Sequence, residues 1–204
     1  MHGPAVTATR LWVERVVIGL ALCPWAKPVH NERQALRFAH SDATCAEGLF
    51  AEVLHEMDLI QSPGSNHEST ILVAPDFTPD DFVEFNDFVR DVEEYFRQED
   101  LDEDYQLVGF HPLFCFAGED PDDAANFVNR SPHPALHLLR QKDVTEAIDS
   151  HPNSLQVPQI NERLLRTMGA ERLRDLIASC CEHAAGQSTR RDDDAGDTEC
   201  GHGG

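Results

Sequence analysis

Three short apolar segments, separated by longer stretches of helical periodicity, constrain the fold of this chain more than any other feature of its sequence. They are LRFAHS (residues 36–41), STILVAP (69–75) and YQLVGFHP (105–112), and each has the length and composition of a buried strand. The intervening stretches are long enough to return the chain to the same end of a sheet, so consecutive strands would run parallel. We therefore predict an α/β fold with a small, three-stranded, mostly parallel sheet covered by helices.

Helices are predicted between the strands and over most of the C-terminal part of the chain. Thr44 and Glu47 form a potential capping box. Thr78 is a potential N-cap, with Pro79 at the first helical position. Apolar residues recur at helical spacing over residues 9–22, 42–60, 78–96, 134–140, 143–149 and 158–183, with a break in the last range near residue 169. The chain is therefore expected to end in a helical C-terminal part.

The chain is strongly acidic, with 37 acidic and 16 basic residues and a formal net charge of −21. This charge repels phosphate groups, so neither nucleic acid nor an anionic membrane surface is an expected partner. No apolar run reaches the roughly 18–20 residues of a membrane span, no export signal is present, and the six cysteines include no CxxC pair. We expect a cytoplasmic protein with one domain over residues 1–185 and a disordered, acidic, Gly-rich tail over 186–204.

The connection after the third predicted strand is the most unusual segment of the chain. It lies within FHPLFCFAGEDPDDAANFVNRSPHPALHLL (residues 110–139) and is rich in proline and large apolar residues. A connection of about twenty residues inside a compact domain is usually functional or disordered, and this composition does not favour disorder. Ligands of open parallel sheets bind outside the carboxyl ends of the strands. Because this connection starts at such an end, we expect a functional site there.

Two residues of the connection are candidates for chemistry. His111 could act as a general acid or base near neutral pH, or it could be hydrogen-bonded to the loop backbone. Arg130 precedes a predicted helix start, with Ser131 or His133 as N-cap, and a guanidinium beside helix N–H groups could bind a small anion. Alternatively, Arg130 pairs with an acidic side chain and holds the loop in place. The acidic residues available for such a pair are Glu119, Asp120, Asp122 and Asp123.

Four further residues are candidates for substrate binding. Asn126 and Asn129 could orient a substrate, or could tie the loop to itself through bonds from side chain to backbone. Ser131 and His137 complete the predicted substrate-binding set.

A catalytic thiol and a metal site are also conceivable. Cys23 could supply a thiolate nucleophile paired with His111, or could be a buried, inert thiol. His111 and His137 could instead converge with Cys23 or Asp76 on a metal ion. His133 and His137 are four residues apart, but the metalloprotease motif HExxH is absent. We assign no metal site and leave the cofactor unknown.

Three motifs, GLALCPWAKPV (19–29), FHPLFCFAG (110–118) and NFVNRSPHPALHLLR (126–140), resemble a bacterial family catalogued as domain of unknown function 1415. The resemblance covers roughly residues 9–169 and implies no activity. Cys115 and His133 depart from the family pattern, which has glutamine and an aromatic residue there, and this weakens any role for either. The matching positions are Cys23, Pro24, His111, Pro112, Phe116, Ala117, Gly118, Asn126, Asn129, Arg130, Ser131, Pro132, Pro134, Leu136, His137, Leu138, Leu139 and Arg140.

The sequence leaves two functions open. The first is an enzyme that binds a small anionic substrate at the carboxyl ends of the strands, with Arg130 and a helix N-terminus as anchor and His111 as acid or base. The second is a non-catalytic protein that binds a metal or another protein. The motifs GxxxxGKS/T, GxGxxG and GxSxG are absent, so nucleotide and serine-hydrolase chemistry lack their usual support. The oligomeric state is not predicted.

Overall fold

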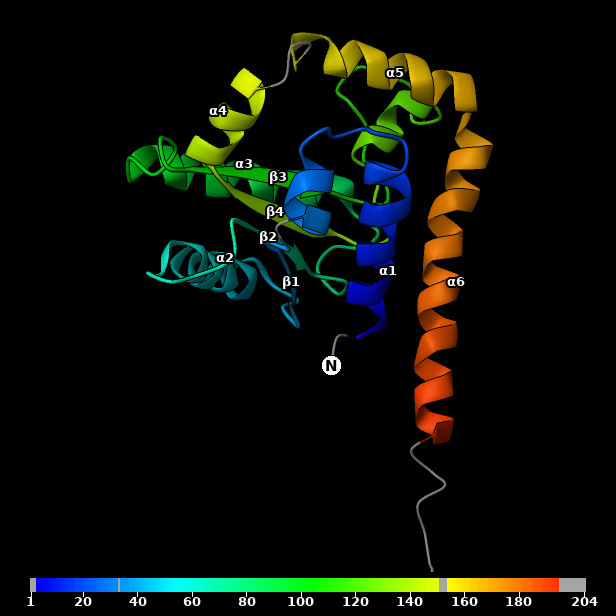
Figure 1. Ribbon diagram of the computed structural model, residues 1–204, viewed down its shortest axis with the longest axis horizontal. Helices are drawn as coiled ribbons and strands as arrows, with labels where there is room; N and C mark the ends of the chain where they lie inside the picture. Colours follow the sequence, from blue (N-terminus) through cyan, green and yellow to red (C-terminus); the bar gives the residue numbers. More distant parts are fainter. Residues whose placement is uncertain (1–2, 33, 151–153, 195–204) are drawn as a thin grey trace, which may run out of the picture.

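One four-stranded sheet organises the fold, which the computed structural model describes for residues 3–32, 34–150 and 154–194 (Figure 1). Its strands are β1 (Leu36–His40), β2 (Ser69–Val73), β3 (Tyr105–Phe110) and β4 (Ala135–Arg140), in the order β1-β2-β4-β3. β1 and β2 are parallel, and β4 is antiparallel to β2 and to β3. The three predicted strands are confirmed. The prediction of a three-stranded, mostly parallel sheet is wrong, because a fourth strand lies between β2 and β3.

The fourth strand is the segment that we predicted as a helix over residues 134–140. In so short a run, the apolar spacing fits a strand as well as a helix. Leu136 and Leu138 pack into the core on one face of the sheet, and Ala135 packs into the core on the other face. In register, Ala135 lies opposite Val73 of β2 and Phe110 of β3. The backbone of β4 is therefore paired on both sides, which satisfies buried N–H and C=O groups that the sequence alone could not assign.

The three predicted strands run in the same direction, as expected, although β4 lies between two of them. Because β4 is antiparallel to both β2 and β3, these two strands run in the same direction, and β1 runs with them. The carboxyl ends of β1, β2 and β3 therefore meet at one edge of the sheet, and β4 begins at the same edge. We call this the strand-end edge.

Helices cover both faces of the sheet (Figure 1). On one face, α2 (Ala46–Gln61) and α3 (Phe82–Gln98) contribute the core residues. On the other face lie α1 (Pro4–Trp12) and α6 (Ala170–Asp194), which run side by side. The remaining helical elements are α4 (Gln141–Ser150), α5 (Val157–Met168), η1 (Val13–Ile18), η2 (Pro28–Glu32), η3 (Ala124–Val128) and η4 (Ser154–Gln156). The fold is thus a mixed α/β architecture with a helical C-terminal part.

The C-terminal helices differ from the prediction in their extent. The break near Gly169 is confirmed, since this residue has φ 82° and separates α5 from α6. The helix α6 continues to Asp194, past the position where we expected a disordered tail to begin. The rest of that predicted tail, residues 195–204, lies outside the described residues.

Neither predicted helix cap is used. The N-cap of α2 is Cys45, which makes no side-chain capping bond, so the capping box of Thr44 and Glu47 does not form. The helix α3 starts at Phe82, because Asp81 caps it by accepting a hydrogen bond from the Glu84 amide at 3.0 Å. Thr78 instead lies in the turn before the helix, with φ 46°. Its carbonyl group takes part in the site described below.

An ion pair between the partly exposed Arg37 and the buried Glu56 connects β1 and β2 to α2. Arg37 donates from Nε to Oε2 of Glu56 at 2.8 Å, and from Nη2 to Oε1 at 3.2 Å. The Thr70 hydroxyl donates to Oε2 of the same carboxylate at 3.0 Å. Glu56 is buried, so its charge is balanced by contacts rather than by water.

Loss of Arg37 should destabilise the fold through the carboxylate that it leaves behind. We expect Arg37→Ala to lower the free energy of unfolding by about 2–3 kcal/mol, because Glu56 would remain buried without its cationic partner. The matched control is Arg90→Ala, which breaks an exposed pair of the same length, 2.8 Å, with Asp87 and should cost at most about 1 kcal/mol. Urea unfolding at pH 7 measures both. Equal losses in the two variants would contradict this account.

Candidate functional site

The connection between β3 and β4, residues 111–134, starts and ends at the strand-end edge. Its ends are adjacent, because Phe110 pairs with Ala135 and the His111 amide donates to the Asn129 carbonyl at 3.2 Å. It is therefore the loop of a wide antiparallel hairpin and does not cross over the sheet. Such a hairpin could be closed by two residues, so the remaining chain length is available for another purpose.

His111 is fully buried at the start of this loop, and backbone groups occupy both of its ring nitrogens. The Leu113 amide donates to Nδ1 at 3.1 Å, and Nε2 lies 2.9 Å from the Thr78 carbonyl oxygen. Because Nδ1 accepts, Nε2 carries the proton and donates, and the ring is neutral. Burial lowers the pKa of His111 and outweighs the opposing effect of the bond to Thr78. This geometry fits the alternative in which His111 is bonded to the loop backbone.

Arg130 also bonds to the loop, but not through the acidic side chains that we expected. Its Nε donates to the Phe114 carbonyl at 2.9 Å, and its Nη2 donates to the Pro121 carbonyl at 2.6 Å. The guanidinium lies over the ring of Phe127, with 4.7 Å to the centroid. Burial lowers its pKa. Within the described part of the chain, no carboxylate lies within 4.0 Å of this guanidinium.

The expected acidic partners of Arg130 are bound elsewhere. Asp123 pairs with Arg166 of α5 at 2.9 Å, and Asp122 pairs with Arg174 of α6 at 3.1 Å. The expected helix N-terminus beside Arg130 is also absent, because the segment after it leads into β4. Of the predicted anion site, which combined Arg130 with a helix N-terminus, only the guanidinium group is present.

The polar residues of the loop mainly satisfy its own backbone. Asn126 is buried, accepts from the Phe116 amide at 3.0 Å and donates to the Asp120 carbonyl at 2.9 Å. Ser131 donates to the His133 carbonyl at 2.6 Å. Asn129 contributes backbone bonds, including the one that accepts from the His111 amide. The structure thus brings His111, Asn126, Asn129, Arg130 and Ser131 together in one loop.

His137 does not belong to this group. It lies on β4 and packs against Phe110, with ring centroids 6.3 Å apart, and Phe110 contacts Trp12 of α1 at 5.1 Å. His111 instead packs against Phe85 of α3, on the opposite face of the sheet, at 5.0 Å. The two histidines therefore cannot share one ligand.

Cys23 is not placed to act as an activated nucleophile. It follows Leu22, which packs in the core between the sheet, α1 and α6. Burial raises its pKa and so disfavours the thiolate. No contact joins Cys23 to His111 in the described residues. Across the same residues, no group of three or more His, Cys, Asp or Glu side chains is arranged to hold a metal ion, and no helix is long and apolar enough to cross a membrane.

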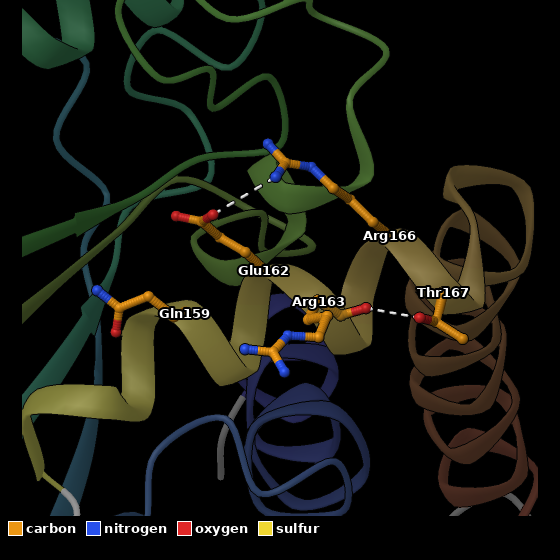
Figure 2. Close-up of a pocket in the computed structure, with 5 residues that line it drawn as sticks. All are labelled: Gln159, Glu162, Arg163, Arg166 and Thr167. Atoms are coloured by element: carbon orange, nitrogen blue, oxygen red, sulfur yellow. Dashed lines mark hydrogen bonds and ion pairs between the residues drawn. The ribbon is translucent and has the colours of Figure 1, made fainter.

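Two surface depressions lie away from the predicted residues. One, of about 470 Å³, is lined by residues of α5, where Arg166 and Glu162 form an ion pair and Arg163 points the other way (Figure 2). The other, of about 310 Å³, lies between β1 and α2. Neither contains any residue that we predicted for the site.

An apolar surface beside His111 was missed in the sequence. Phe82 lies 5.6 Å from the His111 ring and 5.3 Å from Phe114, which in turn lies 4.9 Å from Phe116, so a chain of aromatic rings leads from the core to the surface. The residues next to these rings in the sequence include exposed apolar side chains. We call the strand-end patch the set of Phe82 and Phe114 with the exposed residues Val83 (69%), Leu113 (50%) and Phe116 (39%). The sequence feature that could have predicted this patch is the run PLFCF (residues 112–116), which has more large apolar side chains than a loop can bury.

His111 should behave as a structural residue. We expect His111→Ala to lower the free energy of unfolding by about 2–4 kcal/mol, because it opens a cavity and leaves the Leu113 amide without its acceptor. The exposed His183 of α6 provides a matched control, and His183→Ala should change stability by less than about 0.5 kcal/mol. Urea unfolding measures both. An unchanged stability of His111→Ala would instead indicate a histidine held for function.

His137 should make the fold sensitive to acid. Burial lowers the pKa of His137 from 6.5 to about 4, and its Nε2 has no hydrogen-bond partner in the described residues. Because the folded state binds the proton less readily than the unfolded state, its contribution to stability is complete above about pH 6.5 and is lost as the pH falls toward 4. The loss by pH 4 is about 3 kcal/mol.

The variant His137→Leu isolates this contribution. Urea unfolding between pH 7 and pH 4 should show a smaller loss of stability in His137→Leu than in the wild type, whereas His183→Gln should follow the wild type. Parallel pH profiles for the wild type and His137→Leu would exclude His137 as the titrating group.

The comparisons with known proteins agree with the resemblance seen in the sequence. The family described as "Protein of unknown function (DUF1415)" matches residues 4–175, a range that contains the sheet, the β3–β4 loop and the start of α6. No curated protein and no solved structure matches the chain. Since the match covers most of the sequence, the chain belongs to the family of proteins of unknown function DUF1415.

Proposed function

We propose that this protein is a non-catalytic interaction protein and that it binds a protein partner through the strand-end patch. The observation that carries the proposal is that the exposed Phe116 packs on Phe114, and Phe114 on Phe82, while Leu113 and Val83, the sequence neighbours of these two rings, are also exposed. Exposed apolar side chains that gather in this way are a mark of binding surfaces, whereas scattered ones need no explanation.

The support beneath the patch favours binding. Phe114 and Phe82 pack against each other, and His111 ties the loop to the turn before α3 through its bond to Thr78. Arg130 and Asn126 fix the carbonyl and amide groups of the residues that carry the patch, Phe114 and Phe116. A partner would therefore meet side chains that are already ordered, and less conformational entropy would be lost on binding.

The same bonds weigh against catalysis by these residues. His111 would have to release a backbone partner before it could accept or donate a proton in a reaction, and Asn126 would have to release two. Their hydrogen-bonding groups are already used within the loop and the turn before α3, so the polar residues act as the frame of the patch.

A small-molecule enzyme is the second candidate, and one observation favours it. Arg130 uses two of the five N–H donors of a guanidinium, and in the described residues no carboxylate within 4.0 Å neutralises it. It could bind a small anionic substrate through its remaining donors, with His111 as acid or base after a change in the loop. Thermal stabilisation by phosphate or small carboxylates that is lost in Arg130→Met would favour this candidate.

An unbiased peptide selection tests the interaction proposal. A random peptide display library is selected against the wild type, and selected peptides are measured by fluorescence anisotropy. We expect the double variant Leu113→Ser with Phe116→Ser to lose at least about tenfold in affinity, because apolar anchors at the centre of an interface carry most of its binding energy.

The control removes exposed apolar residues from another place. Leu155 and Ile160 are 87% and 48% exposed, so Leu155→Ser with Ile160→Ser changes surface hydrophobicity to a similar extent. This variant should bind as the wild type does, and circular dichroism melts check that both variants fold. Peptides whose affinity is the same for the patch variant and the wild type would overturn the proposal.

A further inference from the structure

Both segments that form the strand-end patch carry exposed carboxylates next to its residues in the sequence. Asp80 and Asp81 precede α3, and their charges act on the His111 ring beneath the patch, where they oppose the dominant effect of burial. Glu84 is in the first turn of α3, one residue after Val83. Glu119 and Asp120 follow Phe116 after a short turn. We call these five exposed residues the acidic rim.

In the described structure, Arg130, Arg166 and Arg90 make their closest polar contacts outside the acidic rim. Arg130, in the same loop, directs two of its donors to carbonyl groups of the loop. Arg166 forms its closest ion pair with Asp123, and its contact with Glu119 is longer, at 3.9 Å. Arg90, further along α3, pairs with Asp87 at 2.8 Å. The patch is therefore an apolar surface within a field of negative charge.

We infer that the partner of the strand-end patch is a cationic amphipathic segment of another protein. Its apolar side chains cover Leu113 and Phe116, and its lysine or arginine side chains lie against the acidic rim. This inference rests on the proposed function and adds the chemistry of the partner to it. The rim disfavours acidic partners, because like charges brought together at an interface repel each other. It also repels the phosphates of nucleic acids and anionic lipids.

The position of the charges is what the inference requires. With a net charge of −21, the whole molecule attracts basic peptides, and this attraction alone would not identify a binding site. A useful experiment therefore compares two variants that have the same net charge and differ only in where carboxylates are removed.

The helix α3 offers such a pair of variants. Asp80→Asn with Glu84→Gln removes two charges from the acidic rim without touching the capping residue Asp81. Asp91→Asn with Glu93→Gln removes two exposed charges from the same helix, and Glu93 lies about 14 Å along the axis from Glu84 at 1.5 Å per residue. Among the described residues, neither pair makes a hydrogen bond through the side chains that are changed, so both variants should fold.

The probes are the peptides selected on the wild type, together with one designed peptide of leucine and lysine and its analogue with glutamate in place of lysine. We expect the selected peptides to be enriched in lysine and arginine relative to the library. At low salt, the rim variant should bind them about threefold to tenfold more weakly than the control variant, and the difference should shrink at 0.5 M salt. The glutamate analogue should not bind.

Each other outcome has a definite meaning. Equal weakening in the two charge variants would overturn the inference, because attraction would then come from the whole molecule. Patch-dependent peptides without basic enrichment would also overturn it, while leaving the proposed function intact. If basic peptides bind the double variant Leu113→Ser with Phe116→Ser as tightly as the wild type, both the inference and the proposed function are overturned.

Discussion

The pairing of β4 between β2 and β3 is the constraint on which the rest of the structure depends. It makes β3 and β4 neighbours, so that Phe110 and Ala135 lie opposite each other. The loop between these two residues therefore starts and ends at the same place. The length of this loop is therefore not explained by a crossover to a distant strand. Its residues must instead be stabilised where they lie, at the edge where three strands end.

The polar residues of the loop meet this requirement. A long irregular segment exposes many backbone N–H and C=O groups, and those that are buried need partners. His111, Asn126 and Arg130 supply them from inside the loop, whereas Asp122 and Asp123 tie its outer side to α6 and α5. Residues that look catalytic in a sequence are here the means by which irregular backbone is satisfied.

The binding surface that we propose follows from what the loop cannot bury. With the polar groups turned inward, Leu113 and Phe116 are left on the outside, supported by a row of aromatic rings that reaches Phe85 in the core. This combination of a fixed frame and exposed apolar side chains is the basis on which we propose binding rather than catalysis. The acidic residues nearby would give this proposed surface a negative electrostatic potential, which would favour a cationic partner.

The sequence by itself determined the family, the positions of β1, β2 and β3, most of the helices and the unusual length and composition of the β3–β4 loop. These features depend on local periodicity and on motifs, which are visible within a few residues. Only the tertiary structure decided that residues 135–140 form a strand, because a short apolar run becomes a strand when two neighbours can pair with it. It also decided the hydrogen-bond partners of His111 and Arg130, since these are the carbonyl groups of Thr78 and Pro121, and a backbone carbonyl carries no signature in the sequence.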